Sequence, residues 1–592
     1  NSYMSDITLT VDGIEVTVPA GSTIMDAADA AGIRIPRLCH HPKLSIEGAC
    51  RVCIVDAGLR NLVASCCYPA ENGMNVKTHT PEILQLRRDI VELLLDNHPM
   101  DCNSCERDSN CELQRLAYSM GIRERLFAGE RKRYEKDLSG PAIMRDPEKC
   151  VLCGRCVRMC GEIQEVAAIA QVRRGFDTVV APAHEGPIAD SVCIGCGQCV
   201  NVCPTASMLE VDGTQAFLKA VEDPEIVVVG QMAPSVRAAI GEAFGLEPGK
   251  AWEGECFAAM RRIGIDYVFD TQFAADLTIM EEGAEFVKKF TEGNLPNITS
   301  CCPTWVKFAE QFHPDLLPLL STAKSPMSMQ SAIVKTYWAE KMGIDPSKIF
   351  SVAIMCCTCK KAEATRPELN VNGMPATDTV LTTREFAWLI KHMGIDFLNL
   401  KPEEADNPIG DSTGAAVIFG ATGGVTEAAL RSAYFMITGE DLPADALEFK
   451  TVRTLTGVRE ATINIKGTDV NIAVVSGLAN TNKVLEQLQS GEKKYHWIEV
   501  MGCPGGCVGG GGQPYAGANA IPLDESILAK RSAALYNLDE ARVLRCSHHN
   551  PHIQTLYKEF LGEPLSHKSH ELLHTYYYPR LPMGVRPQEA QV

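Results

Sequence analysis

The chain has 592 residues, 45% of them hydrophobic, and a formal net charge of −18. This length exceeds what one hydrophobic core serves, so we expect several domains. The acidic balance argues against nucleic acid or an anionic membrane as a partner, because such binding rests on a concentrated basic surface. No run approaches the ~20 apolar residues of a membrane span, and neither an apolar signal core nor a twin-arginine motif follows Met4, which we expect to be the natural start. We therefore expect a cytoplasmic protein.

The cysteines are the most informative residues of the chain. There are 25 of them, many in repeated C-x2-C runs. Such runs are typical of metal ligands, whereas disulfides need an oxidising compartment. Because thiolates are soft ligands suited to iron–sulfur clusters, the sequence predicts several clusters of this kind.

Residues 4–80 predict a first domain. Alternating residues from 6 to 21 surround an Asp-Gly pair, which predicts a β-hairpin, and a helix is expected over 23–31. Four cysteines follow at C-x10-C-x2-C-x12-C spacing: Cys39, Cys50, Cys53 and Cys66. This arrangement resembles the ubiquitin-like 2Fe-2S domain of large hydrogenases and of the iron–sulfur subunit of respiratory NADH dehydrogenases. Cys67 leaves the fourth ligand open, and the offset favours Cys66.

Residues 81–135 predict a second cluster domain. An amphipathic helix over 81–97 leads into His98, Cys102, Cys105 and Cys111. Three closely spaced cysteines are one ligand short of a 4Fe-4S site, and a lone histidine here is more often a helix-end residue. The same two families place a histidine at this offset, so the resemblance implies that His98 is the fourth ligand. The basic stretch that begins at Arg123 is interpreted as a solvated helix or linker.

Residues 140–212 contain an internal repeat. Both halves follow C-x2-C-x2-C-x3-C, and in two-cluster ferredoxins the fourth cysteine of each half binds the other cluster. One 4Fe-4S cluster is therefore assigned to Cys150, Cys153, Cys156 and Cys203, and the second to Cys193, Cys196, Cys199 and Cys160. A zinc ribbon is the weaker alternative, because zinc does not need eight interleaved thiolates.

Residues 213–530 predict a two-lobed α/β catalytic domain, followed by a wrapping C-terminal tail over 531–592. The expected strands are EIVVVG, DYVFD, FSVAIM, AAVIFG, NIAVVSG, HWIEVM and, more weakly, NIT. Helices are expected from Ser235 and through Glu282 to Phe290. The chain as a whole is thus predicted to combine α/β and α+β domains.

Three cysteine loops in this region predict one site. They read ITSCCPTW around Cys302, IMCCTCKKAE around Cys357, and EVMGCPGGC around Cys503 and Cys507. Each follows an apolar segment, so each is expected at the end of a strand, where α/β folds bind ligands. The glycine run that follows Cys507 lacks the spacing of a nucleotide loop and instead predicts close backbone approach to a cluster.

These loops resemble the three signature loops of the iron-only (FeFe) hydrogenases, including residues that are not ligands. The resemblance implies that Cys302, Cys357, Cys503 and Cys507 hold the 4Fe-4S half of the H-cluster, and that Cys507 bridges to a diiron half with carbonyl, cyanide and an azadithiolate. It implies contacts to that group from Lys360, Ser235, Pro234, Met355 and Met501. It also implies reversible heterolysis of dihydrogen, with a proton relay through Cys301, Glu282, Ser321 and Glu285.

Other residues depart from the family pattern or carry weaker signals. Cys356 and Cys359 are extra thiols in the second loop, although the C-x-x-K offset to Lys360 selects Cys357 as the ligand. Cys256 and Cys546 are interpreted as buried small hydrophobes. Two histidine pairs in the tail, His548 with His552 and His570 with His574, could each share a helix face. A wrapping segment remains favoured over a metal site there, because no third ligand stands at a recognisable offset.

The N-terminal modules imply an electron-transfer partner. The whole chain resembles the catalytic subunit of the multisubunit NAD(P)-linked hydrogenases of anaerobic bacteria, and no nucleotide or flavin motif is present. We therefore expect a hetero-oligomer in which a flavin- and nucleotide-binding subunit docks near residues 1–112, with ferredoxin as a second candidate acceptor. The alternatives are a hydrogen-sensing relative, a non-catalytic cluster scaffold, and an NADH-dehydrogenase subunit, which would share residues only up to about 210.

Overall fold

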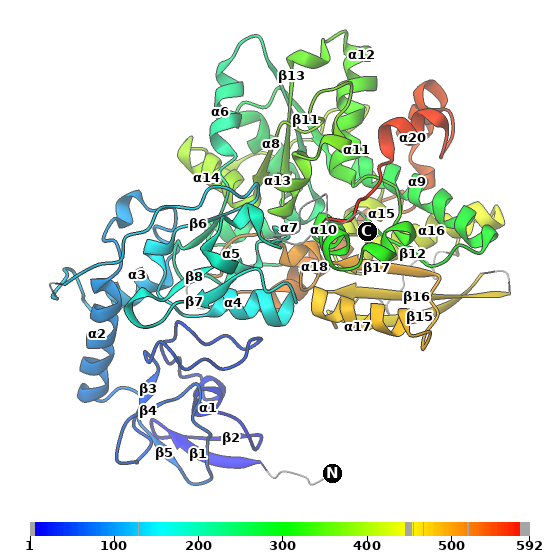
Figure 1. The fold of residues 1–592 in the computed structure, drawn as a ribbon. Coiled ribbons are helices and arrows are strands. Elements are labelled where there is room, and N and C mark those ends of the chain that lie inside the picture. Colours follow the sequence, from blue (N-terminus) through cyan, green and yellow to red (C-terminus); the bar gives the residue numbers. More distant parts are fainter. Residues whose placement is uncertain are drawn as a thin grey trace.

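A computed structural model describes residues 6–580 except 128, 444–452, 454, 466 and 518–519. The expected start at Met4 lies outside the described residues. Figure 1 shows the N-terminal domain in dark blue, with the cyan ferredoxin domain between most of it and the catalytic domain. His41 and Lys43 of the N-terminal domain also contact Pro522 and Glu525 directly. None of the helices in the described part is long and apolar enough to cross a membrane.

The N-terminal domain is built on the predicted hairpin. Strands β1 (Ile7–Val11) and β2 (Ile14–Val18) are antiparallel around Asp12-Gly13, and β5 (Asn75–Val76) joins β1 in parallel. Helix α1 (Ile24–Ala30) starts at a capping box between Thr23 and Asp26 and packs its apolar face on the sheet. The hairpin and helix predictions are confirmed, and strands β3 (Ile54–Val55) and β4 (Val63–Ala64) flank the cysteine loops.

Two small modules connect this domain to the rest of the chain. Helix α2 (Pro81–Asp96) confirms the predicted amphipathic helix, and α3 (Glu112–Ser119) follows the His98 loop. The basic stretch from Arg123 forms no helix in its described residues and is therefore a linker. The ferredoxin domain contains the antiparallel pairs β6 (Ile143–Arg145) with β9 (Met208–Glu210) and β7 (Ala170–Val172) with β8 (Val179–Ala181), and the short helices α4 (Arg155–Arg158) and α5 (Gln198–Val202).

The catalytic domain has two lobes, each with its own sheet. The first sheet is parallel, in the order β11-β10-β13-β14, and consists of β10 (Val227–Met232), β11 (Tyr267–Asp270), β13 (Ile349–Met355) and β14 (Thr379–Thr382). The second has the order β12-β17-β16-β15 and consists of β12 (Asn297–Ile298), β15 (Val458–Ile465), β16 (Thr468–Ser476) and β17 (Trp497–Met501). Apolar clusters cover both faces of each sheet, as continuous apolar strands require.

Long helices join the two lobes. Helix α9 (Thr271–Glu292) packs against both α16 (Gly424–Thr438) and α11 (Pro326–Ile333). Helices α7 (Pro234–Ala239), α10 (Pro303–Phe312) and α13 (Cys359–Ala364) begin in the loops at the strand ends. Figure 1 shows α9, α15 (Gly414–Val417) and α18 (Glu525–Ala541) between the two sheets.

Two predictions need correction. The AAVIFG segment is not a strand: Ala415 to Gly420 form α15 and a 3-10 turn, buried against α9 and α18. Periodicity cannot separate a short buried helix from a short buried strand, which explains the error. The domain boundary placed at 530/531 falls inside α18, so it does not coincide with the end of an element. The tail continues as α19 (Pro551–Leu556) and α20 (His567–Leu573), which packs on α11.

Candidate active site

An enclosed, mostly apolar cavity lies where the carboxyl ends of both sheets meet. The loops after β10, β12, β13 and β17 contribute to its wall. Parallel strands end at a common edge, so four segments far apart in sequence reach one point. This edge position confirms the prediction that the cysteine loops follow strands.

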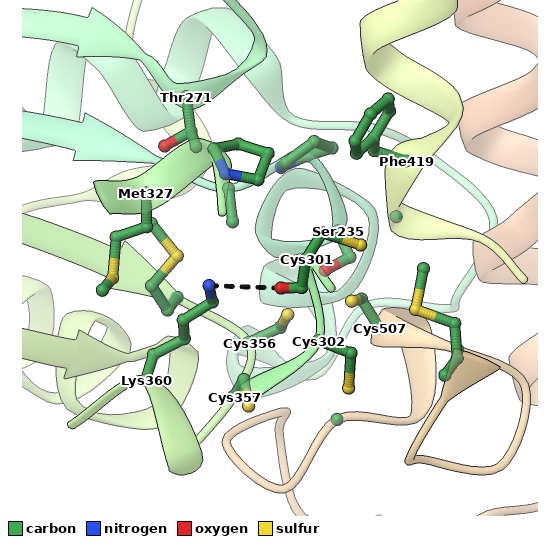
Figure 2. Close-up of a pocket in the computed structure, with 18 of the residues that line it drawn as sticks. Ser235, Thr271, Cys301, Cys302, Met327, Cys356, Cys357, Lys360, Phe419 and Cys507 are labelled. Atoms are coloured by element: carbon green, nitrogen blue, oxygen red, sulfur yellow. Dashed lines mark hydrogen bonds between the residues drawn. The ribbon is translucent and has the colours of Figure 1, made fainter. Parts of the chain in front are cut away.

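The cavity brings the four predicted H-cluster ligands together. Cys302, Cys357, Cys503 and Cys507 all line it. Figure 2 shows the sulfur atoms of Cys302, Cys357 and Cys507 gathered in the lower half of the cavity. Burial, followed by neighbouring thiols that include Cys503 and Cys302, raises the pKa of Cys357 well above its usual value. Thiols that raise one another's pKa repel one another when they ionise. Binding of a metal cluster displaces their protons and compensates the negative charge.

The two extra thiols of the second loop have different positions. Cys356 lines the cavity, and its thiol is within hydrogen-bonding reach of Cys507. Cys359 does not line the cavity: its Sγ donates to the carbonyl of Ile194, 3.0 Å away, in the ferredoxin domain. Thr358 makes a parallel bond of 2.7 Å to the carbonyl of Gly195. Cys359 thus lies at the domain junction.

Polar contacts to a bound group come from few side chains. The Ser235 hydroxyl is buried and has no hydrogen-bond donor or acceptor within range among the described residues, as expected for a group that awaits a ligand. Lys360 Nζ is held 2.7 Å from Glu363 and 3.5 Å from the carbonyl of Cys301, the dashed line of Figure 2. Pro234, Met355 and Met501 complete the wall as predicted, and it also includes residues that the sequence did not single out for contact, Thr271 and Phe419 among them.

The four predicted relay residues lie in one buried region. Cys301 lines the cavity, and Glu282 is close enough for its charge to raise the pKa of the Cys301 thiol, after the larger effect of burial. Ser321 Oγ donates to Glu285 at 2.7 Å. Ser321 is also near enough to Glu282 to lower that carboxyl's pKa, which opposes the larger raising effects of burial and Glu285. Neither carboxyl oxygen of Glu282 has a hydrogen-bond partner among the described residues, so the four side chains lie in one region without a continuous chain of hydrogen bonds.

Comparison with known proteins identifies the family. The model of the iron-only hydrogenase large subunit, C-terminal domain, matches residues 226–511, and that of the iron hydrogenase small subunit matches residues 525–580. The NADP-reducing hydrogenase subunit HndD of Solidesulfovibrio fructosivorans is 49% identical over 591 residues, which covers 98% of this chain and 100% of the relative. The chain belongs to the FeFe hydrogenases.

Further comparisons agree with the predicted fold class of this hydrogenase. Iron hydrogenase 1 of Clostridium pasteurianum is 38% identical, with 96% of this chain and 99% of the relative covered. A solved structure of the FeFe hydrogenase HydA1 from Chlamydomonas reinhardtii has a TM-score of 0.56 at 42% identity and covers 62% of this chain and 99% of that one. Three more family models match the N-terminal third: a 2Fe-2S cluster binding domain at 5–81, the NADH-ubiquinone oxidoreductase-G iron-sulfur binding region at 87–125, and a 4Fe-4S dicluster domain at 149–207.

The cysteines of each predicted accessory site lie near one another in the hydrogenase. Hydrogen bonds with Cys50 and Cys66 lower the pKa of Cys39, and a bond with Cys66 lowers that of Cys53 to about 6. Cys67 is exposed and donates to the carbonyl of Ala64 at 3.5 Å, so it lies outside this group. These contacts favour Cys66 as the fourth ligand.

The His98 site combines a buried histidine with a group of three thiols. His98 is buried, and its Nδ1 has no hydrogen-bond partner among the described residues. Cys105 lies next to Cys102 and Cys111, whose pKa values its charge raises after burial. Cys105 also hydrogen-bonds Lys149, the residue before Cys150. This site therefore borders the first ferredoxin site.

The cysteines of the ferredoxin domain fall into two groups that agree with the interleaved assignment. Burial and the neighbouring thiols of Cys153, Cys150 and Cys203 raise the pKa of Cys156. Burial and the thiols of Cys196, Cys193 and Cys160 do the same for Cys199. Cys160 and Cys203 thus exchange places between the two halves of the repeat.

The cluster sites form a continuous series. Arg158 donates to the carbonyl of Cys39 at 2.7 Å and to that of Cys153 at 3.1 Å, which links the 2Fe-2S site to the first ferredoxin site. At the other end, Cys503 lies near Cys196 of the second ferredoxin site. A Cβ at Gly511 would come within 2.2 Å of the Cys196 carbonyl, so glycine permits close approach of the two backbones.

Sequence reasoning missed residues beyond Glu285. Lys289 forms an ion pair of 3.2 Å with Glu285, one turn along α9. Thr322 donates its backbone N–H to Glu285 and its hydroxyl lies 2.8 Å from Nδ1 of His574. The i, i+4 spacing of Glu285 and Lys289 was a usable signal for the first contact. The contact with His574, 252 residues away, had no local signal.

The protonation of Glu282 gives a first prediction. Burial, and then Glu285, raise the pKa of Glu282 from 4.5 to about 8. A carboxyl with a raised pKa keeps its proton to higher pH, so Glu282 should be protonated below about pH 8 and ionised above it. Infrared difference spectra should show a carboxylic C=O band that disappears as the pH rises through this value.

Two variants on α9 control that experiment. Glu282→Gln should lack the band, whereas Glu292→Gln, at an exposed site on the same helix, should keep it. A Glu282 band that titrates near the ordinary value of 4.5 would contradict the assignment.

Proposed function

We propose that this FeFe hydrogenase catalyses reversible heterolytic cleavage of dihydrogen at an H-cluster held by Cys302, Cys357, Cys503 and Cys507. The observation that carries the proposal is the convergence of these four thiols, from three loops, on one enclosed apolar cavity. Thiolates are the ligands that a 4Fe-4S group requires, and the unpartnered Ser235 hydroxyl fits a bound group with hydrogen-bond acceptors.

In the proposed site, the protein's own side chains would orient the H-cluster and exclude water. When bound, the diiron half with its carbonyl, cyanide and azadithiolate would supply the centre at which dihydrogen is split or formed. Ser235 would donate a hydrogen bond from the N-terminal turn of α7, and Lys360, fixed by Glu363, would donate from the opposite wall. Met355 and Met501 keep the cavity dry, which strengthens these electrostatic contacts.

We further propose that protons pass between the cavity and the surface through Cys301, Glu282, Ser321 and Glu285. Burial holds the Cys301 thiol in its protonated form, so it can donate a proton inward and receive one from Glu282. Glu282, with a pKa of about 8, can give and take a proton near neutral pH. Ser321 donates to Glu285, which also accepts from the Thr322 N–H and pairs with the half-buried Lys289 on α9.

Electrons would travel through four accessory clusters. We assign one 2Fe-2S cluster to the N-terminal domain and three 4Fe-4S clusters to the His98 site and the ferredoxin domain. The continuity of sites from Cys39 through Cys153 and Cys196 to Cys503 supports this path. The His98 site meets the same first ferredoxin site, so the two N-terminal clusters converge there.

We propose that the electron partner is a separate flavin- and nucleotide-binding subunit in the cytoplasm, with ferredoxin as a second candidate. The match to the NADH-ubiquinone oxidoreductase-G region and the relative named as an NADP-reducing hydrogenase subunit support a multisubunit complex. Exposed leucines on α2, Leu86 and Leu93, are seven residues apart and so share a face on which such a partner could dock.

The partner proposal is tested by comparing two electron acceptors, a viologen dye and NADP. The matured single chain should exchange electrons between dihydrogen and a viologen dye, but should not reduce NADP until the flavoprotein subunit is added. In the complete complex, Cys53→Ser should remove the 2Fe-2S cluster and abolish NADP reduction while the dye reaction continues, with Cys67→Ser as the matched control. NADP reduction by the single chain alone would refute the partner proposal.

A further inference from the structure

A cluster of metal-binding side chains lies outside the catalytic site, where the C-terminal segment meets α16. Cys546, His548 and His549 place one ligand atom each within 4.8 Å of one another. Asp441, which follows the end of α16, adds a carboxylate: its Oδ1 lies 2.8 Å from Nε2 of His548 and 3.2 Å from Nε2 of His549. Two segments about a hundred residues apart in sequence therefore contribute four potential ligands to one point.

The local backbone explains how three ligands fit into four residues. Cys546 caps a 3-10 turn over Ser547–His549, closed by the bond from the His549 N–H to the Cys546 carbonyl at 3.0 Å. This tight turn brings the ligand atoms of Cys546 and His549 to within 4.8 Å of each other. The earlier pairing of His548 with His552 missed this arrangement, because it assumed α-helical spacing.

His548 is held in the orientation that a ligand needs. Its Nδ1 lies 2.9 Å from Ser432 Oγ, so Nε2 is the nitrogen that faces Asp441. Its ring stacks on Phe435, with centroids 4.3 Å apart. Metal-bound histidines are commonly fixed in this way through the second ring nitrogen. Ser432 and Phe435 both belong to α16, so the helix that positions His548 also leads to Asp441.

We propose that Asp441, Cys546, His548 and His549 form a zinc site that fastens the C-terminal segment to α16. Ligand atoms of a tetrahedral zinc site are separated by roughly 3.3–3.8 Å, as follows from metal–ligand distances of about 2.0–2.3 Å, and the separations here bracket that range. One thiolate and one carboxylate neutralise Zn²⁺, so a half-buried site carries no net charge.

The exposure of the ligands suits uptake of the ion. His548 is buried, whereas 39% of the His549 side chain and 49% of the Asp441 side chain are exposed. Metal binding would displace the proton of Cys546, whose pKa burial raises to about 11, so zinc occupancy should increase with pH. A structural zinc site with two exposed ligands can fill after the chain has folded.

The test uses the fully matured holoenzyme, because empty cluster sites could also take zinc. The protein is incubated with zinc, desalted, and analysed for zinc and iron together. We expect one tightly held zinc per chain at unchanged iron content, and a zinc-edge X-ray absorption spectrum with one sulfur and three nitrogen or oxygen ligands. Cys546→Ser and His549→Gln should each lose most of the zinc and keep the iron, while His567→Gln, at an exposed histidine of α20, should keep both.

Stability gives a second readout. Zinc should raise the temperature of unfolding of the wild-type holoenzyme, by linkage of binding to folding, and should leave that of His549→Gln unchanged. The proposal fails if the matured wild type retains no zinc after desalting. It also fails if Cys546→Ser and His549→Gln retain as much zinc as the wild type, because the four side chains would then form only a hydrogen-bonded cluster.

Discussion

Substitution of Cys507 by alanine should reduce dihydrogen turnover to background and remove the diiron group from the matured protein. Cys507 lines the cavity beside Cys302 and Cys357, and it is assigned both to the 4Fe-4S half and to the bridge between the halves. Loss of the Cys507 thiolate removes the only link that we propose between the 4Fe-4S half and the diiron half. Iron analysis of the matured variant should therefore show less iron per chain than the wild type.

Cys356 provides the matched control for that substitution. It lines the same cavity and its thiol lies within hydrogen-bonding reach of Cys507, but it is not assigned as a ligand. Cys356→Ala should keep its iron and most of its turnover. If Cys356→Ala lost the diiron group and Cys507→Ala kept it, the assignment of the two cysteines would be reversed.

Substitution of Cys301 by alanine should lower turnover by roughly 10²–10⁴-fold while the cofactor stays in place. Cys301 is the cavity residue nearest to the buried Glu282 in the proposed relay, and alanine cannot carry a proton. Infrared bands of the cofactor should persist, because Cys301 is not a ligand. The measurement is dye-linked turnover and the infrared spectrum on the same sample.

The comparison with Cys301→Asp sharpens this experiment. A carboxyl is a proton carrier, so the aspartate variant should recover part of the lost rate and show an altered pH profile. Loss of the infrared bands in Cys301→Ala would show that the thiol retains the cofactor, and the relay role would then have to be abandoned.

The cysteine spacings made the cluster sites predictable, because ligand sets repeat at short, fixed offsets. The interleaving of Cys160 and Cys203 follows from the repeat alone, and the structure brings together the same groups. Strands β10, β13 and β17 were also predictable, since each is a largely apolar run that ends at a loop lining the cavity.

What the sequence could not predict depends on contacts between distant segments. The short run AAVIFG was misassigned because its burial between α9 and α18 is decided by tertiary packing. The position of Cys359 at the ferredoxin junction depends on its bond to Ile194, 165 residues away. The Asp441 contact with His548 likewise joins two segments whose proximity no local pattern indicates.

The infrared spectrum of the matured wild-type chain tests the central proposal most directly. If the cavity bounded by Cys302, Cys357, Cys503 and Cys507 holds the H-cluster, the protein should show bands of metal-bound carbonyl and cyanide, and these bands should shift when dihydrogen is added. A matured protein with full iron content that consumes dihydrogen but shows neither kind of band would contradict the assignment of this cavity.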